Sequence, residues 1–254
     1  MKWSYYSLSD RGQKRDHNED AFYNHEPYSL FLVADGMGGI QCWDMASMVA
    51  LSSIVSHMTL NCKDQSLFSE KMFRQAIAYA NQTVFNIKAI NPQIKSMGTT
   101  LVCFVPGHTE GFVFNIGDSR LYLFRNQELL QITQDHSSEQ DALPEFMRGL
   151  YQGKFSNSLS RALGTHESVE ADLFAFPYVL GDQILLCSDG LYRMLSASQI
   201  SEILNQKKSV KQKCEELIHK ANKAGGEDNI TVTLLQIKTL DQPGILDFSA
   251  PEQL

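Results

Sequence analysis

The sequence predicts an α+β protein built from layered antiparallel sheets. Strand-like and helix-like patterns are segregated along the chain, in the order strands, two helices, many strands, two helices and a final strand. Short turns join the successive strand candidates between residues 99 and 133, as in antiparallel hairpins. A doubly wound fold would instead alternate strands with helices.

The N-terminal half contains strand candidates followed by two helices. Trp3–Ser9 is a short aromatic stretch, and Ser29–Ala34 is an apolar run that we expect to end at a Gly-rich turn, Asp35-Gly36. Apolar residues then recur at helical spacing in Met45–Met58 and Leu67–Ile90. We expect the apolar faces of both helices to pack on the core.

The C-terminal half supplies the remaining strands and a second pair of helices. The expected meander consists of Thr99–Val105, Gly111–Ile116, Arg120–Arg125 and Glu128–Thr133. A mixed polar stretch, residues 134–157, is interpreted as an insertion. The later expected elements are Ala171–Phe176, Gln183–Cys187, Ala197–Leu204, Ser209–Ala224 and Ile230–Ile237. We therefore expect one domain over residues 1–240 and a short tail, residues 241–254.

Composition and charge narrow the function classes. The 254 residues are 43% hydrophobic and 20% charged, as in ordinary globular proteins. A net charge of -7 argues against a nucleic-acid partner, because such proteins usually carry a basic stripe. The five cysteines form no C-x-x-C pair, which argues against a zinc site or disulfide framework. With neither a signal-peptide pattern nor an apolar span, we expect a cytoplasmic protein.

The acidic residues that indicate chemistry lie beside glycine or asparagine, near predicted strand ends. They are Glu19-Asp20, Asp35-Gly36, Gly117-Asp118, Asp189-Gly190 and Asp228-Asn229. Carboxylates that converge at sheet ends repel one another unless cations lie between them. Mg²⁺ and Mn²⁺ prefer such oxygen ligands. A single Asp-Gly is usually only a turn signal, so the interpretation depends on the whole set.

These acidic residues belong to longer motifs that occur in a fixed order. The motifs are Ser9-Asp10-x-Gly12-x-x-Arg15-x-x-Asn18-Glu19-Asp20, Val33-Ala34-Asp35-Gly36-Met37-Gly38-Gly39, Met97-Gly98-Thr99-Thr100, Gly117-Asp118-Ser119-Arg120, Gln134-Asp135-His136-Ser137, Ser160-Arg161-Ala162-Leu163-Gly164, Leu186-Cys187-Ser188-Asp189-Gly190-Leu191 and Asp228-Asn229-Ile230-Thr231. From about Ser7 to Ile237 the chain resembles the metal-dependent protein phosphatases of type 2C, in their bacterial form.

The resemblance implies a four-layer α-β-β-α sandwich, in which two antiparallel sheets are flanked by helix pairs. It also implies two divalent ions, Mn²⁺ or Mg²⁺, at one end of the sandwich. The implied ligands are Asp35 between both ions, Asp189 and Asp228 on the first, and Glu19 and the Gly36 carbonyl on the second, with Asp20 acting through water.

The resemblance also implies roles in binding substrate and a further ion. Arg15 would clamp the substrate phosphate with its planar fork of donors. Asp118 would join Asp189 in holding a third, weaker ion. The implied reaction is hydrolysis of phosphoserine and phosphothreonine by a hydroxide that bridges the two metals. The implied substrates are phosphoproteins made by a Ser/Thr kinase of the same cell, and we expect a monomer.

The chain departs from the family pattern after the Gly-Gly pair. Ile40 stands where many bacterial relatives have His, and Trp43-Asp44 replaces Gly-Glu. The proton donor for the leaving oxygen is therefore open. His57 and His136 are the nearby candidates in the sequence, with His57 expected to be structural. Residues 134–157 correspond to the flap of the family.

Two other functions are considered. The first is a pseudophosphatase that binds phosphoprotein without turnover, which the complete acidic set disfavours: Glu19, Asp20, Asp35, Asp118, Asp189 and Asp228. The second is nucleotide binding by the loop Asp35–Gly39. That loop lacks the Gly-Lys-Ser/Thr ending of a phosphate loop, which disfavours nucleotide binding.

Overall fold

Two antiparallel sheets pack face to face in the computed structural model, which describes residues 2–25, 29–38, 45–61, 69–91, 93–94, 96–107, 110–137 and 159–239. The first sheet has the order β1 (Lys2–Asp10), β11 (Ile230–Thr239), β10 (Gln183–Cys187), β7 (Arg120–Arg125) and β8 (Glu128–Gln131). The second has the order β2 (Asp20–His25), β3 (Leu30–Gly38), β5 (Leu101–Pro106), β6 (Glu110–Ile116) and β9 (Asp172–Pro177), and β4 (Met97–Thr99) pairs with β3.

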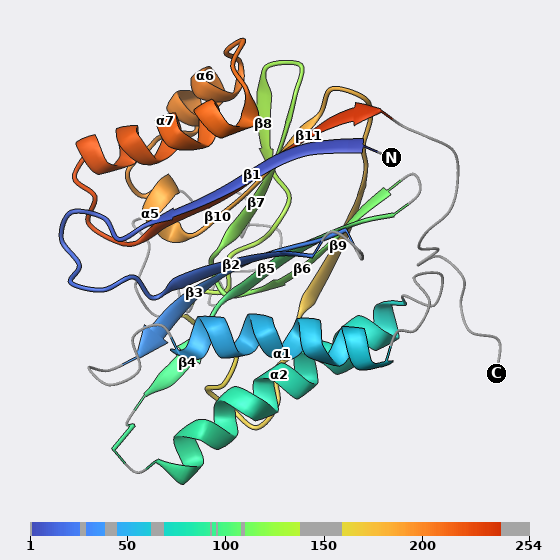
Figure 1. The fold of residues 1–254 in the computed structure, drawn as a ribbon, viewed down its shortest axis with the longest axis vertical. Coiled ribbons are helices and arrows are strands. Elements are labelled where there is room, and N and C mark those ends of the chain that lie inside the picture. Colours follow the sequence, from blue (N-terminus) through green and yellow to red (C-terminus); the bar gives the residue numbers. More distant parts are fainter. Residues whose placement is uncertain are drawn as a thin grey trace.

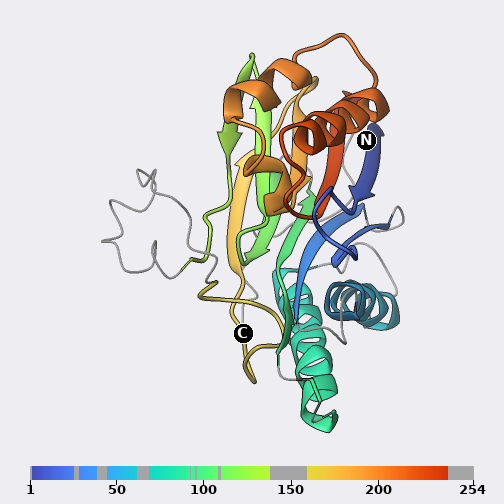
Figure 2. The same cartoon turned by 90° about the vertical axis from the view of Figure 1, so that its left-hand side faces the viewer.

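Helices cover the outer face of each sheet. The second sheet carries α1 (Met45–Asn61) and α2 (Glu70–Ile90), which pack against each other and on β2 to β4. The first sheet carries α5 (Asp189–Tyr192), α6 (Ala197–Leu204) and α7 (Val210–Lys223). Figures 1 and 2 show the resulting helix–sheet–sheet–helix layers. The predicted fold class is confirmed.

Strand alternation builds three hydrophobic layers from these elements. Along β3, Leu30 and Leu32 face the α1–α2 layer, whereas Phe31 and Val33 face the space between the sheets. Along β10, Leu185 faces α5 to α7, while its neighbours face the other sheet. The central strands β5 and β10 are therefore buried on both faces, which explains why they are nearly continuous apolar runs.

Two local predictions were wrong, and two elements were missed. Strand β3 does not end at Asp35-Gly36 but continues to Gly38, because Gly36–Gly38 pairs with Met97–Thr99 in β4. Strand β2 and helix α5 were not predicted. The expected four-strand meander is split, because β5 and β6 pair in the second sheet while β7 and β8 pair in the first. The turn Gly117–Ser119 therefore crosses from one sheet to the other.

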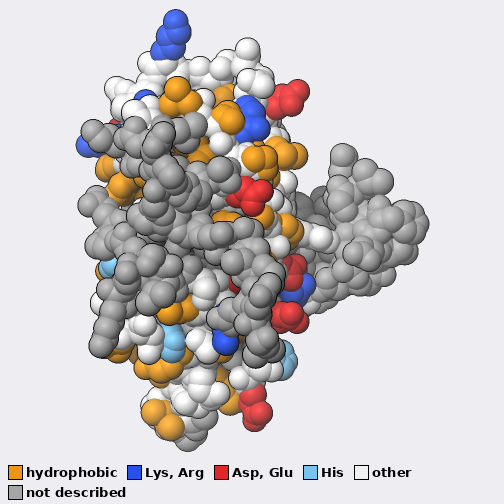
Figure 3. All heavy atoms as spheres, turned by 90° about the vertical axis from the view of Figure 1, so that its right-hand side faces the viewer, with side chains coloured by type: hydrophobic (Ala, Val, Ile, Leu, Met, Phe, Trp, Pro, Cys, Tyr) orange, Lys and Arg blue, Asp and Glu red, His pale blue; other side chains and the backbone are white. Residues whose placement is uncertain are grey.

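Some expectations concern residues outside the described ranges. These include Ile40, Trp43 and Asp44, the tail 241–254 and most of the insertion 134–157, of which only 134–137 are described. The three described cysteines, Cys103, Cys187 and Cys214, are buried free thiols. No helix within the described ranges is long and apolar enough to cross a bilayer. On the face drawn in Figure 3, the described acidic, basic and hydrophobic side chains are interspersed.

Candidate active site

The space between the sheets changes from apolar to acidic along the strands. Its apolar part includes Trp3, Tyr5 and Leu235. The next positions on the same faces are hydroxyl pairs, Ser7 with Thr233 at 2.8 Å and Ser9 with Thr231 at 2.6 Å. Beyond these hydroxyl pairs, toward the same end of the sandwich, the side chains are the carboxylates described below. The pleat thus directs acidic side chains into the interior at one end of the sandwich.

Asp20 and Asp35 lie directly opposite each other in the β2–β3 pair. Asp20 is 7% exposed, and its Oδ2 accepts a hydrogen bond of 2.6 Å from the hydroxyl of Ser188, at the end of β10 in the other sheet. The Oδ1 atom of Asp20 is buried without a hydrogen-bond partner among the described residues. Thr100 fixes the main chain of Asp35 through two hydrogen bonds of 2.9 Å. The Asp35 amide donates to the Thr100 hydroxyl, and the Thr100 amide donates to the Asp35 carbonyl.

Glu19 and Gly36 are held together through the backbone. The Gly36 amide donates to the Glu19 carbonyl at 3.1 Å, and the Ser47 hydroxyl donates to the same carbonyl at 2.6 Å. A Cβ atom on Gly36 would lie 2.5 Å from that carbonyl oxygen. Only glycine allows this approach. The Glu19 amide in turn donates to the side chain of Asn229 at 2.8 Å.

Asp189 and Asp228 come from the first sheet. Asp189 begins α5 directly after β10, and its Oδ2 is paired with Arg193 at 2.8 Å. Asp189 Oδ1 is buried and has no hydrogen-bond partner within the described ranges. Asp228 precedes β11, and its Oδ2 is paired with Arg15 at 2.7 Å. Arg15 is half exposed, with 51% of its side chain accessible.

Asp118 reaches this end of the sandwich on the turn that crosses between the sheets. The preceding residue, Gly117, has a φ of 96°, which glycine adopts readily. Asp118 is 9% exposed; its carbonyl accepts from the Tyr192 hydroxyl at 2.9 Å, and its carboxylate lies 3.4 Å from Arg193. The structure therefore brings Asp20, Asp35, Asp118, Asp189 and Asp228 to one end of the sandwich.

Burial and mutual repulsion make these carboxylates hard to ionise. Burial, opposed by the Ser188 hydroxyl, raises the pKa of Asp20 from 3.8 to about 6. Burial also raises the pKa of Asp189 to about 6, despite Arg193. The pKa of Asp118 rises to about 7 through burial and the charge of Asp189. For Asp35, burial followed by the neighbouring aspartates raises the pKa well above its usual value.

A cleft of about 550 Å³ opens at this acidic end. Residues from both sheets and from the segment after residue 158 line it: Arg15, Glu19, Asp35, Gly36, Met37, Gly38, Thr100, Asp118, Leu159, Ser160, Ala162, Thr165, His166, Asp189, Arg193, Asp228 and Asn229. A substrate phosphate entering the cleft would thus meet both the carboxylates and two arginines.

The residues fit hard divalent ions by their chemistry. As the side chains stand, no three His, Cys, Asp or Glu groups within the described ranges converge on one ion position, and arginines pair with Asp189 and Asp228. The donors are all oxygen, however, and two buried carboxylate oxygens, on Asp20 and Asp189, are unpartnered in the described part of the chain. Bound cations would neutralise a cluster that is otherwise strongly repulsive.

The two histidines suggested by the sequence do not line the cleft. His136 is 1% exposed; its Nδ1 accepts from the Gly117 amide at 3.1 Å, which leaves Nε2–H to donate to Asp172 at 3.0 Å. His57 packs against Tyr79 between α1 and α2, with ring centroids 5.2 Å apart. Both are structural in these contacts. His166, which sequence reasoning did not select, lines the cleft.

Other site residues were also missed. Ser188, Thr100 and Asn229 fix the acidic residues through side-chain hydrogen bonds, although each lies inside a recognised motif. Arg193 had one local signal, its position four residues after Asp189 at the start of a helical turn. Its approach to Asp118 depends on the crossing turn and was not visible in the sequence.

Comparisons with known proteins agree with this geometry. The family model for protein phosphatase 2C matches residues 10–234. The chain belongs to the protein phosphatase 2C family. The serine/threonine phosphatase stp of Listeria monocytogenes is 36% identical over 253 residues, covering 93% of this chain and 96% of that protein. Protein phosphatase PhpP of Streptococcus pneumoniae is 31% identical over 243 residues, covering 92% and 97%.

Solved structures of other proteins superpose over nearly the whole chain. PppA of Pseudomonas aeruginosa has a TM-score of 0.80 at 28% identity and covers 93% of this chain and 98% of its own. The catalytic domain of PstP in complex with two manganese ions has a TM-score of 0.79 at 31% identity, covering 93% and 99%. The predicted family, fold class and serine/threonine phosphatase activity are confirmed, and so is metal dependence at the level of the family.

Proposed function

We propose that this chain removes phosphate from phosphoserine and phosphothreonine of proteins, at a centre of two divalent ions held at the acidic end of the sandwich. The observation that carries the proposal is the convergence of Asp35, Asp118, Asp189 and Asp228 on one cleft. In addition, Asp20 and Asp189 each have a buried carboxylate oxygen with no hydrogen-bond partner among the described residues. Mn²⁺ and Mg²⁺ suit this all-oxygen donor set.

The proposed ligand assignment follows the family resemblance and is supported by which residues share the cleft. Asp35 would contact both ions, Asp189 and Asp228 would hold the first, and Glu19 and the Gly36 carbonyl would hold the second. Asp20, which accepts a hydrogen bond from Ser188, would act through water. The hydrogen bond between Gly36 and the Glu19 carbonyl keeps the second pair adjacent. Asp118 and Asp189 are proposed for a third, weaker ion.

When bound, the ions supply hydroxide near neutral pH and stabilise charge on the phosphoryl group. The protein positions the reactants. Arg15 is half exposed at the cleft, so its guanidinium can leave Asp228 and bind two phosphate oxygens. Thr100 and Ser188 keep Asp35 and Asp20 in place through their hydrogen bonds.

The proposed proton donor for the leaving oxygen is His166. It lines the cleft, and its carbonyl accepts from the buried side chain of Asn81 at 3.0 Å, which fixes the loop. Nitrophenolate leaves without protonation, whereas a seryl oxygen needs a proton. His166→Gln should therefore slow hydrolysis of a phosphopeptide much more than that of p-nitrophenyl phosphate. His57→Gln is the control, because His57 packs against Tyr79 and does not line the cleft.

The substrates of a serine/threonine phosphatase are phosphoproteins. We further propose that they are products of a Ser/Thr kinase of the same cell, that the chain works as a monomer in the cytoplasm, and that residues 1–240 form one catalytic domain. The opposing apolar faces of the two sheets support the single domain, because they share one core between them.

The experiment that tests this function is turnover of p-nitrophenyl phosphate and a phosphothreonine peptide by metal-stripped protein, with and without Mn²⁺. Turnover that requires Mn²⁺ supports the proposal. Tight binding of the phosphopeptide without turnover would instead indicate a pseudophosphatase. Binding of a nucleoside triphosphate without either effect would indicate a nucleotide-binding protein.

A further inference from the structure

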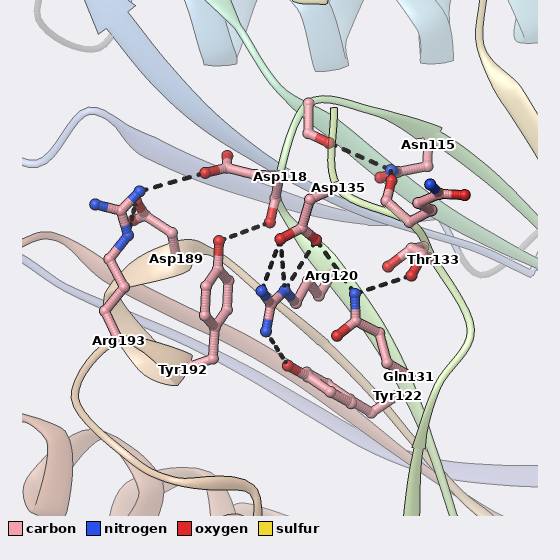
Figure 4. Close-up of polar contacts among 12 residues, drawn as sticks. Asn115, Asp118, Arg120, Tyr122, Gln131, Thr133, Asp135, Asp189, Tyr192 and Arg193 are labelled. Atoms are coloured by element: carbon pink, nitrogen blue, oxygen red, sulfur yellow. Dashed lines mark hydrogen bonds and ion pairs between the residues drawn. The ribbon is translucent and has the colours of Figure 1, made fainter. Parts of the chain in front are cut away.

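Arg193 contacts the carboxylates of two different elements. Its Nε lies 2.8 Å from Asp189 Oδ2, one helical turn earlier on α5, and its Nη2 lies 3.4 Å from Asp118 Oδ2 on the crossing turn. Figure 4 shows dashed lines from the Arg193 guanidinium to both acidic side chains. One positive charge therefore bridges two carboxylates that lie beside adjacent strands, one before β7 and one after β10.

The two carboxylates need a cation. Asp118 and Asp189 are 9% and 7% exposed, and both lie within 3.4 Å of the same guanidinium, so two negative charges stand close together with little solvent between them. Asp189 Oδ1 is buried and has no hydrogen-bond partner in the described ranges, so the pair retains capacity for a further cation. Arg193 itself is 26% exposed and lines the cleft, so its side chain has room to move aside.

A buried network anchors the backbone on both sides of this bridge. The Tyr192 hydroxyl donates to the Asp118 carbonyl at 2.9 Å. The Arg120 guanidinium lies 3.5 Å from the centre of the Tyr192 ring and binds both oxygens of Asp135, at 2.9 and 2.6 Å. Figure 4 shows these residues in one cluster. The backbone of α5 is thus held against the Asp118 turn, while the Arg193 side chain occupies the position where another cation would contact both carboxylates.

We infer that Arg193 is a built-in cation that competes with a divalent ion for Asp118 and Asp189, and so sets how weakly this pair binds the ion. The inference rests on the proposed function, because it assumes that ions bind in the cleft. A guanidinium satisfies both carboxylates without the dehydration that a small divalent ion requires. A divalent ion that binds Asp118 and Asp189 must displace the Arg193 guanidinium or be repelled by its charge at a distance of a few ångströms. Arg193 is a positioning residue in this scheme.

The experiment is calorimetric titration of metal-stripped protein with Mn²⁺, which gives the number and affinity of the binding steps without relying on activity. Arg193→Gln should tighten the weakest step, which uses both Asp118 and Asp189, about tenfold, a modest share of the Coulomb repulsion removed. The step of the first ion should tighten less, because it shares only Asp189 with Arg193. Adding Asp118→Asn should abolish the gain. Arg125→Gln is the control, because Arg125 pairs with Asp182 at the opposite end of β7.

The inference would be overturned if the weakest Mn²⁺ binding step had the same or a lower affinity in folded Arg193→Gln than in wild type. It would also be overturned if neither wild type nor Arg193→Gln showed that step. If Arg193→Gln does not fold, Arg193→Lys decides. Its ammonium reaches only one carboxylate, so the weakest step should tighten by about threefold, and no change would refute competition. Wild-type turnover of p-nitrophenyl phosphate is measured in parallel. Turnover with tight Mn²⁺ binding but no effect of Arg193 defeats only this inference, whereas loss of both defeats the proposed function.

Discussion

Asp20→Asn should stabilise the metal-free protein while weakening its response to Mn²⁺. Asp20 is 7% exposed, lies opposite Asp35, and has one oxygen without a partner in the described part of the chain. An asparagine is neutral, and its carbonyl can still accept the Ser188 hydroxyl that now binds Asp20 Oδ2. The substitution therefore removes a buried charge while keeping the hydrogen bond.

The magnitude follows from the pKa of Asp20, which burial raises from 3.8 to about 6. A difference of this size corresponds to at most about 3 kcal/mol of destabilisation once the carboxylate ionises. Because the pKa of Asp20 is higher in the folded state, its contribution to the free energy of unfolding is most favourable below pH 3.8. That contribution is lost as pH rises through about 6. Asp35 bears part of this destabilisation, because the two carboxylates repel each other. We therefore expect Asp20→Asn to raise the free energy of unfolding of the metal-free protein by about 1–3 kcal/mol at pH 8.

The assay is a set of thermal melts of metal-stripped wild type and Asp20→Asn between pH 4.5 and 8, repeated with saturating Mn²⁺. Without metal, the variant should melt higher at pH 8, by roughly 2–10 °C, and the gap should close toward pH 4.5. With Mn²⁺ the order should reverse, because the wild type keeps its water-mediated ligand. A variant that is less stable than wild type in metal-free buffer at pH 8 would refute this electrostatic reasoning.

Three further predictions concern other parts of the site. Asp35→Ala should lower phosphate release by at least about 10³-fold, roughly 4 kcal/mol of transition-state stabilisation; a variant keeping a third of the activity would contradict its bridging role. Arg15→Ala should raise KM and weaken inhibition by inorganic phosphate. It should not lower the affinity for Mn²⁺, because it leaves the charge of Asp228 without its arginine partner. An unchanged KM with a loss of Mn²⁺ binding would mean that Arg15 is structural. Gly36→Ala should cost about 1–3 kcal/mol in melts and weaken Mn²⁺ binding, since its Cβ would lie 2.5 Å from the Glu19 carbonyl. Gly181→Ala, strained at a φ of 93° but in open space, should lower only stability.

The regular elements were predictable where a buried strand or amphipathic helix leaves a periodic signal. Residues 36–38 were not, because their glycines indicate a turn locally, and only pairing with β4 makes them a strand. Strand β2 carries exposed aromatic residues, Phe22 and Tyr23, and therefore shows no clean alternation. A turn with a left-handed glycine at 117 fits a hairpin and a crossing between sheets equally well, so the split of the expected meander required the tertiary fold.

The acidic residues at the cleft were predictable because each sits in a motif next to a strand end. Their partners depend on three-dimensional contacts. Arg193 contacts Asp118 only because the chain crosses between sheets at residues 117–119. His136 is not available as the proton donor for the leaving oxygen, because its Nδ1 accepts a hydrogen bond from the Gly117 amide and it does not line the cleft. His166 carries no local motif of its own, and its place in the cleft follows from the anchoring of its loop by Asn81 on α2.

The most direct test of a metal centre at this cleft is a single titration that follows bound Mn²⁺ and phosphate release from a phosphothreonine peptide in the same sample. Metal-stripped protein should release no phosphate, and release should rise with occupancy of the tight steps and reach its plateau as they fill. In Asp35→Ala, both the tight steps and phosphate release should be lost. Full phosphate release by stripped protein with no bound Mn²⁺ would contradict a metal-dependent mechanism at this site.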